Sequence, residues 1–215
     1  MKNINTSKFW DQKLFRESSD LASSPIYIHK NNIVLRHVSK IPGPVLDIGF
    51  GNGYLEELIT QNDFKNKLYG IDISKYAIYL LNVKFGKTFV NGKITDIPFK
   101  DKKFDIVIAL DILEHIPKSK ISIALSEVNR VLGNNGKFIV SVPVNESPVD
   151  SRNNGHLRNY TKIIFINEME RSGFEVEKIY SLYAFKSYYF IKSLINQYFF
   201  KIKKPNLLIF IMHKS

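Results

Sequence analysis

The chain has 215 residues, and 44% of them are hydrophobic, which is enough apolar material to bury one sizeable core and suits a single domain. It contains no cysteine, so disulfide bonds, thiolate metal sites and a cysteine nucleophile are excluded. Its 31 lysines and arginines exceed its 20 aspartates and glutamates, and the net charge of +11 favours an anionic partner or surface without identifying it.

The first 20 residues are polar and charged and lack the apolar stretch of a secretory signal. No apolar run approaches the ~20 residues that a membrane-spanning helix requires. We therefore expect a cytoplasmic protein, and peripheral attachment to a membrane is compatible with this expectation.

The first predicted strand, Val45–Ile48, runs directly into a glycine-rich turn. An acid, Asp47, stands two residues before the first glycine of this turn. Glycine lets a turn bring bare backbone against a ligand, and a short apolar run is typical of a buried parallel strand. The dinucleotide fingerprint would require a glycine where the chain has Tyr54. The turn glycines are Gly49, Gly51 and Gly53.

Strand-like and helical segments alternate along the rest of the chain, which predicts a doubly wound α/β sheet. The helix expected before the fifth strand has an apolar stripe and Gly133 as its stop signal. Strands are predicted over Leu68–Ile71, Thr88–Asn91, Phe104–Leu110, Lys137–Val142, Phe174–Tyr180 and Asn206–Met212. Helices are predicted over Tyr54–Thr60, Ser74–Phe85, Ser119–Leu132 and Thr161–Ser172.

Four segments, in this order, resemble the motifs of class I S-adenosylmethionine-dependent methyltransferases of the type 11-like subgroup. They are Asp47–Gly53, Leu68–Ser74, Gly92–Phe99 and Phe104–Ile116. The resemblance covers most of the chain. It implies a Rossmann-like, doubly wound sheet of seven strands, mostly parallel with the last strand antiparallel, and S-adenosylmethionine as the cofactor.

The resemblance also implies the cofactor contacts. The glycine turn and Asp47 would lie at the methionine end, where Asp47 would meet the cationic amino group, or cap the following helix, or do both. The next strand would end in Asp72 and Ile73, where the Asp72 carboxylate would accept hydrogen bonds from the ribose hydroxyls. A residue of this type can also cap the helix that follows it.

The adenine and methionine sides follow in the same way from the resemblance. The Asp96 side chain would contact the exocyclic amine of adenine, and the Ile97 N–H would donate a hydrogen bond to a ring nitrogen. Alternatively, Thr-Asp-Ile-Pro is an ordinary turn sequence. Leu110 and Asp111 would flank the methionine moiety through backbone groups.

Two histidines are candidates for acid/base catalysis, which is needed only where the acceptor atom keeps its proton near neutral pH, as a hydroxyl does. His115 follows the fourth strand, and His156 lies in the polar stretch Asn145–Tyr160. Alternatively, His115 is a hydrogen-bonded structural residue, and the segment of His156 is a helix entry with Thr161 as N-cap. Neither histidine has a second one at metal-ligand spacing, so we expect no metal.

We expect an N-terminal helical cap over residues 1–40, a cofactor-binding core over 45–181, and a helical insertion with the final strand over 182–215. The cap would fold over the cofactor or pack on the sheet edge. The stretch Lys186–Lys204 combines lysines with aromatic and aliphatic side chains. This combination suits a membrane interface or lipid-like acceptor, RNA, or a half-buried inserted helix with solvated lysines.

The sequence therefore predicts transfer of a methyl group from S-adenosylmethionine to a small-molecule or lipid-linked acceptor, preferably at oxygen. A tRNA or other nucleic-acid methyltransferase is the alternative that the charge supports. However, Asp111–Glu114 stands where an amino-methylating Asn-Pro-Pro-Tyr motif would be. A non-catalytic, cofactor-binding partner subunit is the third possibility.

Overall fold

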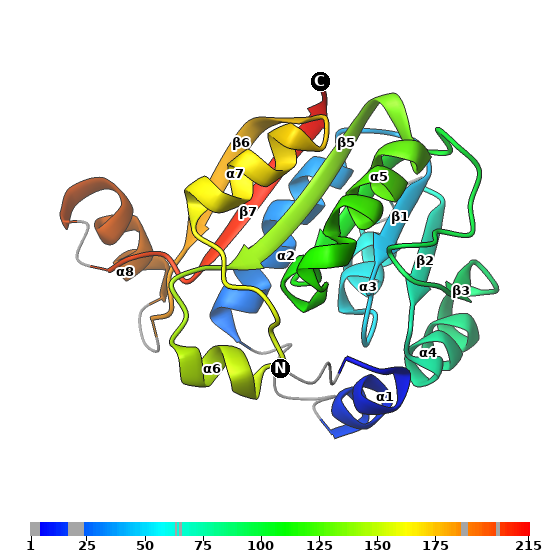
Figure 1. Cartoon of the computed structure of the whole chain (residues 1–215), viewed down its shortest axis with the longest axis horizontal. Coiled ribbons are helices and arrows are strands. Elements are labelled where there is room, and N and C mark those ends of the chain that lie inside the picture. Colours follow the sequence, from blue (N-terminus) through cyan, green and yellow to red (C-terminus); the bar gives the residue numbers. More distant parts are fainter. Residues whose placement is uncertain (1–4, 17–23, 63, 65, 186–188, 201–202) are drawn as a thin grey trace.

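The computed structural model describes residues 5–16, 24–62, 64, 66–185, 189–200 and 203–215. Within them, seven strands form one sheet in the order β3-β2-β1-β4-β5-β7-β6 (Figure 1). β1 to β5 are mutually parallel, and β7 is antiparallel to both of its neighbours, β5 and β6, which confirms the predicted sheet. The strands are β1 Val45–Ile48, β2 Leu68–Asp72, β3 Phe89–Asn91, β4 Phe104–Leu110, β5 Leu132–Pro143, β6 Phe174–Leu182 and β7 Leu207–Lys214.

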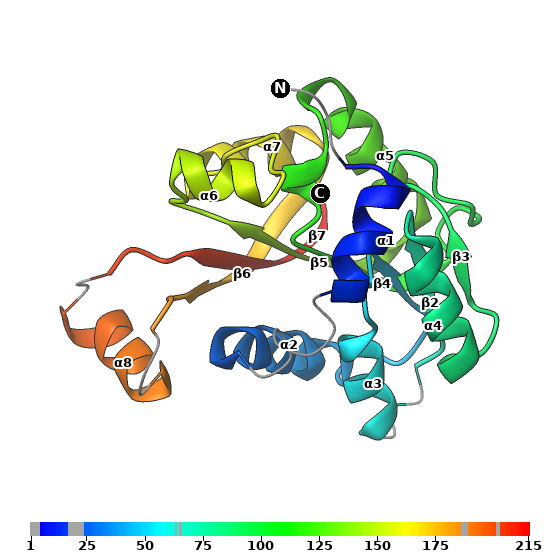
Figure 2. The same ribbon diagram turned by 90° about the horizontal axis from the view of Figure 1, so that it is seen from below.

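Helices cover both faces of the sheet: α2 and α3 lie on one face, and α5 and α7 on the other (Figure 2). In the described part of the chain, no helix has the length and apolar character needed to cross a membrane. The helices are α1 Ser7–Arg16, α2 Pro25–Val38, α3 Tyr54–Gln61, α4 Lys75–Phe85, α5 Ile121–Val131, α6 Pro148–Asn153, α7 Lys162–Arg171 and α8 Tyr189–Ile195. Short 3-10 turns cover Leu113–His115 and Lys118–Lys120, and a π-helical turn, Asn196–Phe200, continues α8.

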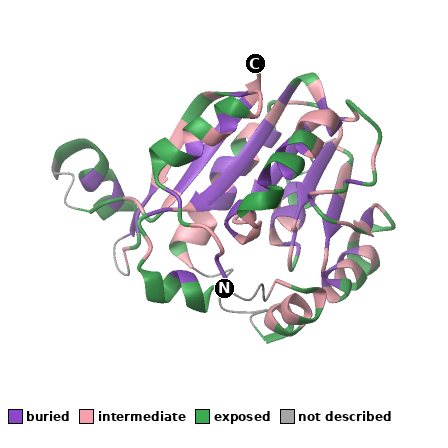
Figure 3. Ribbon diagram, viewed as in Figure 1, coloured by how far each residue is buried: buried purple, intermediate pink, exposed green. Residues whose placement is uncertain are grey.

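The two cores follow from the two-residue period of the strands. In β4, Val107 and Ala109 pack beneath α5, whereas Ile106 and Ile108 pack on the α2 and α3 side. Because both faces are covered, the central strands are apolar on both sides, as parallel strands usually are. Figure 3 shows the buried strands and the contrasting exposure of α8.

Two local predictions were wrong. Gly133 does not stop a helix, because α5 ends at Val131 and the chain enters β5 at Leu132, which pairs with Phe104. A Cβ on Gly133 would lie 3.2 Å from the Phe104 carbonyl oxygen, so this glycine permits close strand contact instead.

The second error concerns the polar stretch 145–160, which contains an unpredicted helix, α6. Its sequence signals are a Ser147 N-cap, whose side chain accepts a hydrogen bond from the Asp150 N–H, and Pro148 in the first turn. The predicted cap at the next helix is confirmed, since the Thr161 hydroxyl accepts a hydrogen bond from the Ile164 N–H.

Candidate active site

A cavity of about 360 Å³ lies at the carboxyl ends of β1, β2 and β4, a common location and size for a small-molecule site in an open α/β sheet. Its walls come from the glycine turn, the ends of β2 and β4, the segment 92–95, the 3-10 turns and the N-terminal segment. Among the predicted site residues, those that line it are Gly49, Gly51, Asp72, Ile73, Leu110, Asp111 and His115.

The turn after β1 needs its glycines. Gly49, Gly51 and Gly53 all have φ between 55° and 75°, a left-handed conformation that other residues rarely adopt. Gly49 and Gly51 line the cavity, and a Cβ on Gly49 would lie 2.2 Å from Ile112 Cδ1. Gly53 lies outside the cavity as the N-cap of α3, where a Cβ would lie 2.5 Å from Leu81 Cδ1. Bare backbone therefore faces the ligand space at the turn.

Asp72 ends β2 and is fixed by the glycine turn. Its Oδ2 accepts a hydrogen bond from the Gly51 N–H at 3.1 Å, and its Oδ1 accepts one from the Ser74 N–H at 2.7 Å. Burial raises its pKa, although these backbone donors oppose the rise. The carboxylate thus lines the cavity but does not cap the following helix, because Ser74 is the N-cap of α4 and its hydroxyl accepts the hydrogen bond from the Ala77 N–H.

The structure places the residues predicted for the adenine side outside the cavity lining. Ile97 is buried, and its N–H donates to Glu127 Oε2 at 2.8 Å. The Asp96 N–H donates to the Lys93 carbonyl within a turn. The preceding residues line this part of the cavity instead. They are Gly92, Lys93, Ile94 and Thr95.

At the opposite end, Asp111 is held by an ion pair that the sequence did not reveal. Lys30 of α2 is buried, and its Nζ lies 2.6 Å from Asp111 Oδ2, while the Ser141 hydroxyl donates to Oδ1 at 2.6 Å. Burial favours a higher pKa for Asp111, but Lys30 and Ser141 outweigh it and the net shift is downward. Asp111 has a φ of 57°, so the strand ends in a strained turn at the cavity.

Asp47 lies behind the glycine turn, outside the cavity lining, beside a second buried carboxyl, Glu56 of α3. It does not cap α3, since Gly53 stands at the N-cap and no side chain caps that helix. Burial raises the pKa of Asp47 to about 6, and burial together with the Asp47 charge raises that of Glu56 well above its usual value. The pair therefore retains a proton at pH values where isolated carboxyls lose theirs.

His115 lines the cavity and is held in place by its neighbours. Its Nδ1 lies 3.2 Å from the Gly155 carbonyl oxygen, and Trp10 of α1 contacts the ring edge to face, with centroids 4.9 Å apart. Since a carbonyl only accepts hydrogen bonds, Nδ1 carries the proton and Nε2 carries the lone pair. Burial, followed by the nearby His156, lowers the pKa of His115 to about 4, so the ring is neutral at pH 7.

His156 lines a second cavity of about 350 Å³ beside α6, not the first one. Its ring centroid lies 4.8 Å from that of His115, and its Nδ1 lies 2.6 Å from Glu146 Oε2. Glu114 is fully buried next to the two histidines, and neither of its oxygens has a hydrogen-bond partner in the described part of the chain.

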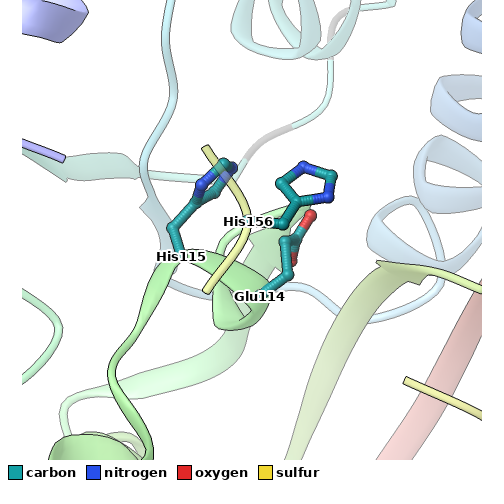
Figure 4. A group of neighbouring side chains, drawn as sticks. All are labelled: Glu114, His115 and His156. Atoms are coloured by element: carbon teal, nitrogen blue, oxygen red, sulfur yellow. The ribbon is translucent and has the colours of Figure 1, made fainter. Parts of the chain in front are cut away.

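Donor atoms of Glu114, His115 and His156 lie within 4.8 Å of one another (Figure 4). No metal was expected from the sequence because His115 and His156 lie far apart along the chain, but the fold brings the two side chains together. Imidazole and carboxylate groups gathered in this way can relay a proton or, if they close further, ligate a divalent cation.

The N-terminal segment covers the cavity. Asn5, Trp10 and Leu14 are among its lining residues. α1 is fastened to the start of α4, where Asp11 Oδ1 accepts hydrogen bonds from the Ser74 hydroxyl at 2.6 Å and the Tyr76 N–H at 3.2 Å. Of the two arrangements expected for this segment, α1 therefore adopts the one over the cavity, while α2 packs on the sheet.

Residues 46–140 match the methyltransferase domain family. An uncharacterized protein of Methanocaldococcus jannaschii is 35% identical over 105 residues, which are 49% of this chain and 40% of that protein, so the chain matches less than half of its relative.

Solved structures with TM-scores near 0.7 share the fold. The 1,6-didemethyltoxoflavin-N1-methyltransferase of Burkholderia thailandensis, with bound S-adenosylhomocysteine, has a TM-score of 0.71 at 15% identity, over 97% of this chain and 87% of that one. The N-methyltransferase NodS of Bradyrhizobium japonicum has a TM-score of 0.70 at 14% identity, over 96% of this chain and 98% of that one. The structure of a complex of the Haloferax volcanii Trm112 methyltransferase activator has a TM-score of 0.71 at 14% identity, over 97% of both chains.

The match over residues 46–140 shows a methyltransferase domain in this part of the chain, and the strand order is the one typical of class I S-adenosylmethionine-dependent methyltransferases. S-adenosylmethionine is the cofactor of this class. The cavity fits it, because bare glycine backbone, a fixed carboxylate at the end of β2 and the lining segment 92–95, where Ile94 lies between Lys93 and Thr95, occur in one space.

Proposed function

We propose that this chain transfers the methyl group of S-adenosylmethionine to a hydroxyl of a small-molecule or lipid-linked acceptor bound beside His115. The observation that carries the proposal is that His115, with a neutral ring and a fixed tautomer, lines the same cavity as the glycine turn and Asp72. A base for the acceptor and the elements that hold the cofactor therefore share one space.

In the proposed reaction, the protein contributes mainly by positioning. The cofactor supplies a methyl group already activated by its cationic sulfur. The glycine turn and Asp72 would hold the cofactor, with the Asp72 carboxylate accepting hydrogen bonds from its ribose hydroxyls, and α1 would exclude water. Such alignment can supply ~7–11 kcal/mol of a barrier.

His115 removes the acceptor proton in this proposal. Its Nδ1–H donates to the Gly155 carbonyl, which leaves the Nε2 lone pair to accept a proton from the hydroxyl. General base catalysis of this kind contributes roughly 10²–10⁴-fold. His156 and Glu146 form a hydrogen-bonded pair behind the ring, and we propose that they hold the His115 loop in position and do not contact the acceptor.

The test is transfer of labelled methyl from S-adenosylmethionine to phenolic, polyprenyl-linked and RNA acceptors by wild type, His115→Asn and a control, His213→Asn, altered on β7. We expect a hydroxyl acceptor to be methylated and His115→Asn to lower kcat by about 10²–10⁴-fold while cofactor affinity is retained. Full activity of His115→Asn would remove it as the base. Methylation of RNA alone would favour the nucleic-acid alternative, and cofactor binding without any transfer would favour a partner subunit.

A further inference from the structure

Between β6 and β7 the chain forms an arm, residues 189–200, which consists of α8 and the π-helical turn and projects from the body in both views (Figures 1 and 2). Its polarity is reversed compared with an ordinary surface helix. The buried side includes two polar residues, Ser193 and Asn196, together with Tyr189. The outward side chains are large and apolar, and each is 38% to 74% exposed. They are Phe190, Ile191, Leu194, Ile195, Tyr198 and Phe199.

This outward orientation is fixed by specific contacts. The Tyr189 hydroxyl lies 3.1 Å from Nδ1 of His29 in α2. At the other end of the arm, the Asn196 side chain accepts a hydrogen bond from the Lys203 N–H at 2.7 Å and donates one to its carbonyl at 2.9 Å. Because Tyr189 ties the arm to α2 and Asn196 ties its far end to the segment that follows it, the apolar side chains cannot turn inward without breaking these bonds.

The charged side chains that neighbour the arm along the chain have a single sign. The chain contains no aspartate or glutamate after Glu177, whereas Lys192 lies in the arm, and Lys203 and Lys204 follow it closely. Exposed apolar side chains flanked by lysines match a bilayer of anionic lipids, in which acyl chains accept the apolar groups and phosphates attract the lysines.

Two other occupants fit less well. A second copy of this chain would bring the same lysines and the same net charge of +11 against the arm. RNA would match the charge and the rings, but Ile191, Leu194 and Ile195 have no aromatic face on which a base can stack.

The arm lies at the edge of the sheet that carries the cavity. β5 and β6 both run antiparallel to β7, so β6 ends where the parallel strands end, and the arm starts there. α2 connects the two places, because His29 contacts the arm while the adjacent Lys30 pairs with Asp111 at the cavity.

We propose that this arm docks the protein on an anionic lipid bilayer, with the apolar side chains in the headgroup region and the lysines against the phosphates. Docking does not depend on catalysis. If the proposed function is also correct, docking places a lipid-linked acceptor at the cavity edge, and that part rests on the proposed function.

The test is vesicle flotation with the full chain, using phosphatidylcholine alone or with about one third phosphatidylglycerol. Wild type should bind only the anionic vesicles, and Phe190→Ser/Leu194→Ser/Phe199→Ser should weaken binding at least about tenfold, because each change removes an apolar group from the bilayer. The matched control is Tyr79→Ser/Val83→Ser/Ile163→Ser, which changes equally exposed apolar residues on α4 and α7 and should bind like wild type.

S-adenosylhomocysteine titration of each variant separates docking from the proposed function. Variants that bind the ligand like wild type are folded, so lost flotation then reports the arm itself. The proposal is overturned by absent flotation of wild type, by equal binding to neutral vesicles, or by equal losses in both triple variants. Arm-dependent binding of polyuridine without vesicle binding would assign the arm to RNA, and an arm-dependent dimer without vesicle binding would assign it to a second copy.

Discussion

The cavity and the α8 arm have opposite electrostatic character within one basic chain. Carboxyl groups gather at or directly behind the cavity, whereas the chain beyond Glu177 contains none. The carboxyl groups are those of Asp47, Glu56, Asp72, Asp111 and Glu114. The net charge of +11 therefore describes the surface and not the site, and each region suits a different partner: a cationic cofactor inside and an anionic surface outside.

The two regions also differ in how their charges are stabilised. Buried carboxyls are costly, and here they are stabilised by Lys30, by backbone N–H groups or by retention of a proton. The lysines near the arm lie at the surface, where water screens them and their main effect is long-range attraction. Substitutions should therefore change stability or cofactor affinity at the cavity, but only surface binding at the arm.

The largest expected effect is at the ion pair between buried Lys30 and Asp111, whose side chain is 35% exposed at the cavity. Lys30→Met leaves Asp111 uncompensated and should lower the free energy of unfolding by about 3 kcal/mol, measured by urea unfolding. The exposed pair Lys84–Glu57 provides the control, since Lys84→Met should cost less than about 1 kcal/mol. Similar losses in both variants would show that burial does not distinguish the two pairs.

The second effect is the pH dependence of stability, which should report the shifted pKa values of His115 and Asp47. The folded pKa of His115 is about 4, below the ordinary 6.5, so its contribution is present above pH 6.5 and is lost as the pH falls towards 4, by up to about 3 kcal/mol. Asp47, with its pKa raised to about 6, acts oppositely and destabilises as the pH rises through this range. Urea unfolding at pH 4.5 to 7.5 should therefore show that stability gains less with rising pH in His115→Gln than in wild type, and gains more in Asp47→Asn than in wild type. Parallel curves for wild type and both variants would contradict these shifts.

The next effect concerns the contribution of Asp72 to cofactor affinity. Asp72→Asn removes a charged acceptor and should weaken S-adenosylhomocysteine binding about 10- to 100-fold, measured by calorimetry. Asp96→Asn is the matched control: its sequence motif predicts an adenine contact, whereas the structure places it outside the cavity lining. We expect Asp96→Asn to bind like wild type. A loss in Asp96→Asn equal to that in Asp72→Asn would support the sequence motif instead.

The smallest expected effect is at the arm. Lys204→Gln should weaken binding to anionic vesicles about fivefold at low salt and leave cofactor affinity unchanged. Flotation at two salt concentrations measures the first, and calorimetry the second. A change in cofactor affinity would mean that the two regions are not independent.

The sequence predicted features that depend on neighbours along the chain. β1, the glycine turn and β4 follow from local apolar runs and glycine spacing, and they appear at the predicted residues. The seven-stranded sheet and its antiparallel last strand came from the family resemblance, and the strand order was not predicted, since local pattern alone does not specify which strands pair.

Contacts between distant segments were not predictable. Lys30 and Trp10 reach the site from the N-terminal helices, and an amphipathic helix gives no signal for which of its polar residues will be buried against a strand end. Glu56 stands in the first turn of α3, where acids are common, so its position in the sequence gives no signal that it is buried beside Asp47. The junction at Leu132 was missed because helix-stop rules assume a loop, and here the strand begins at once.

Calorimetric titration of the purified protein with S-adenosylmethionine, S-adenosylhomocysteine and NAD tests the central claim most directly. We predict micromolar binding of the first two ligands and no binding of NAD. Absence of heat with both S-adenosyl ligands, or binding of NAD in their place, would contradict the assignment of the cavity.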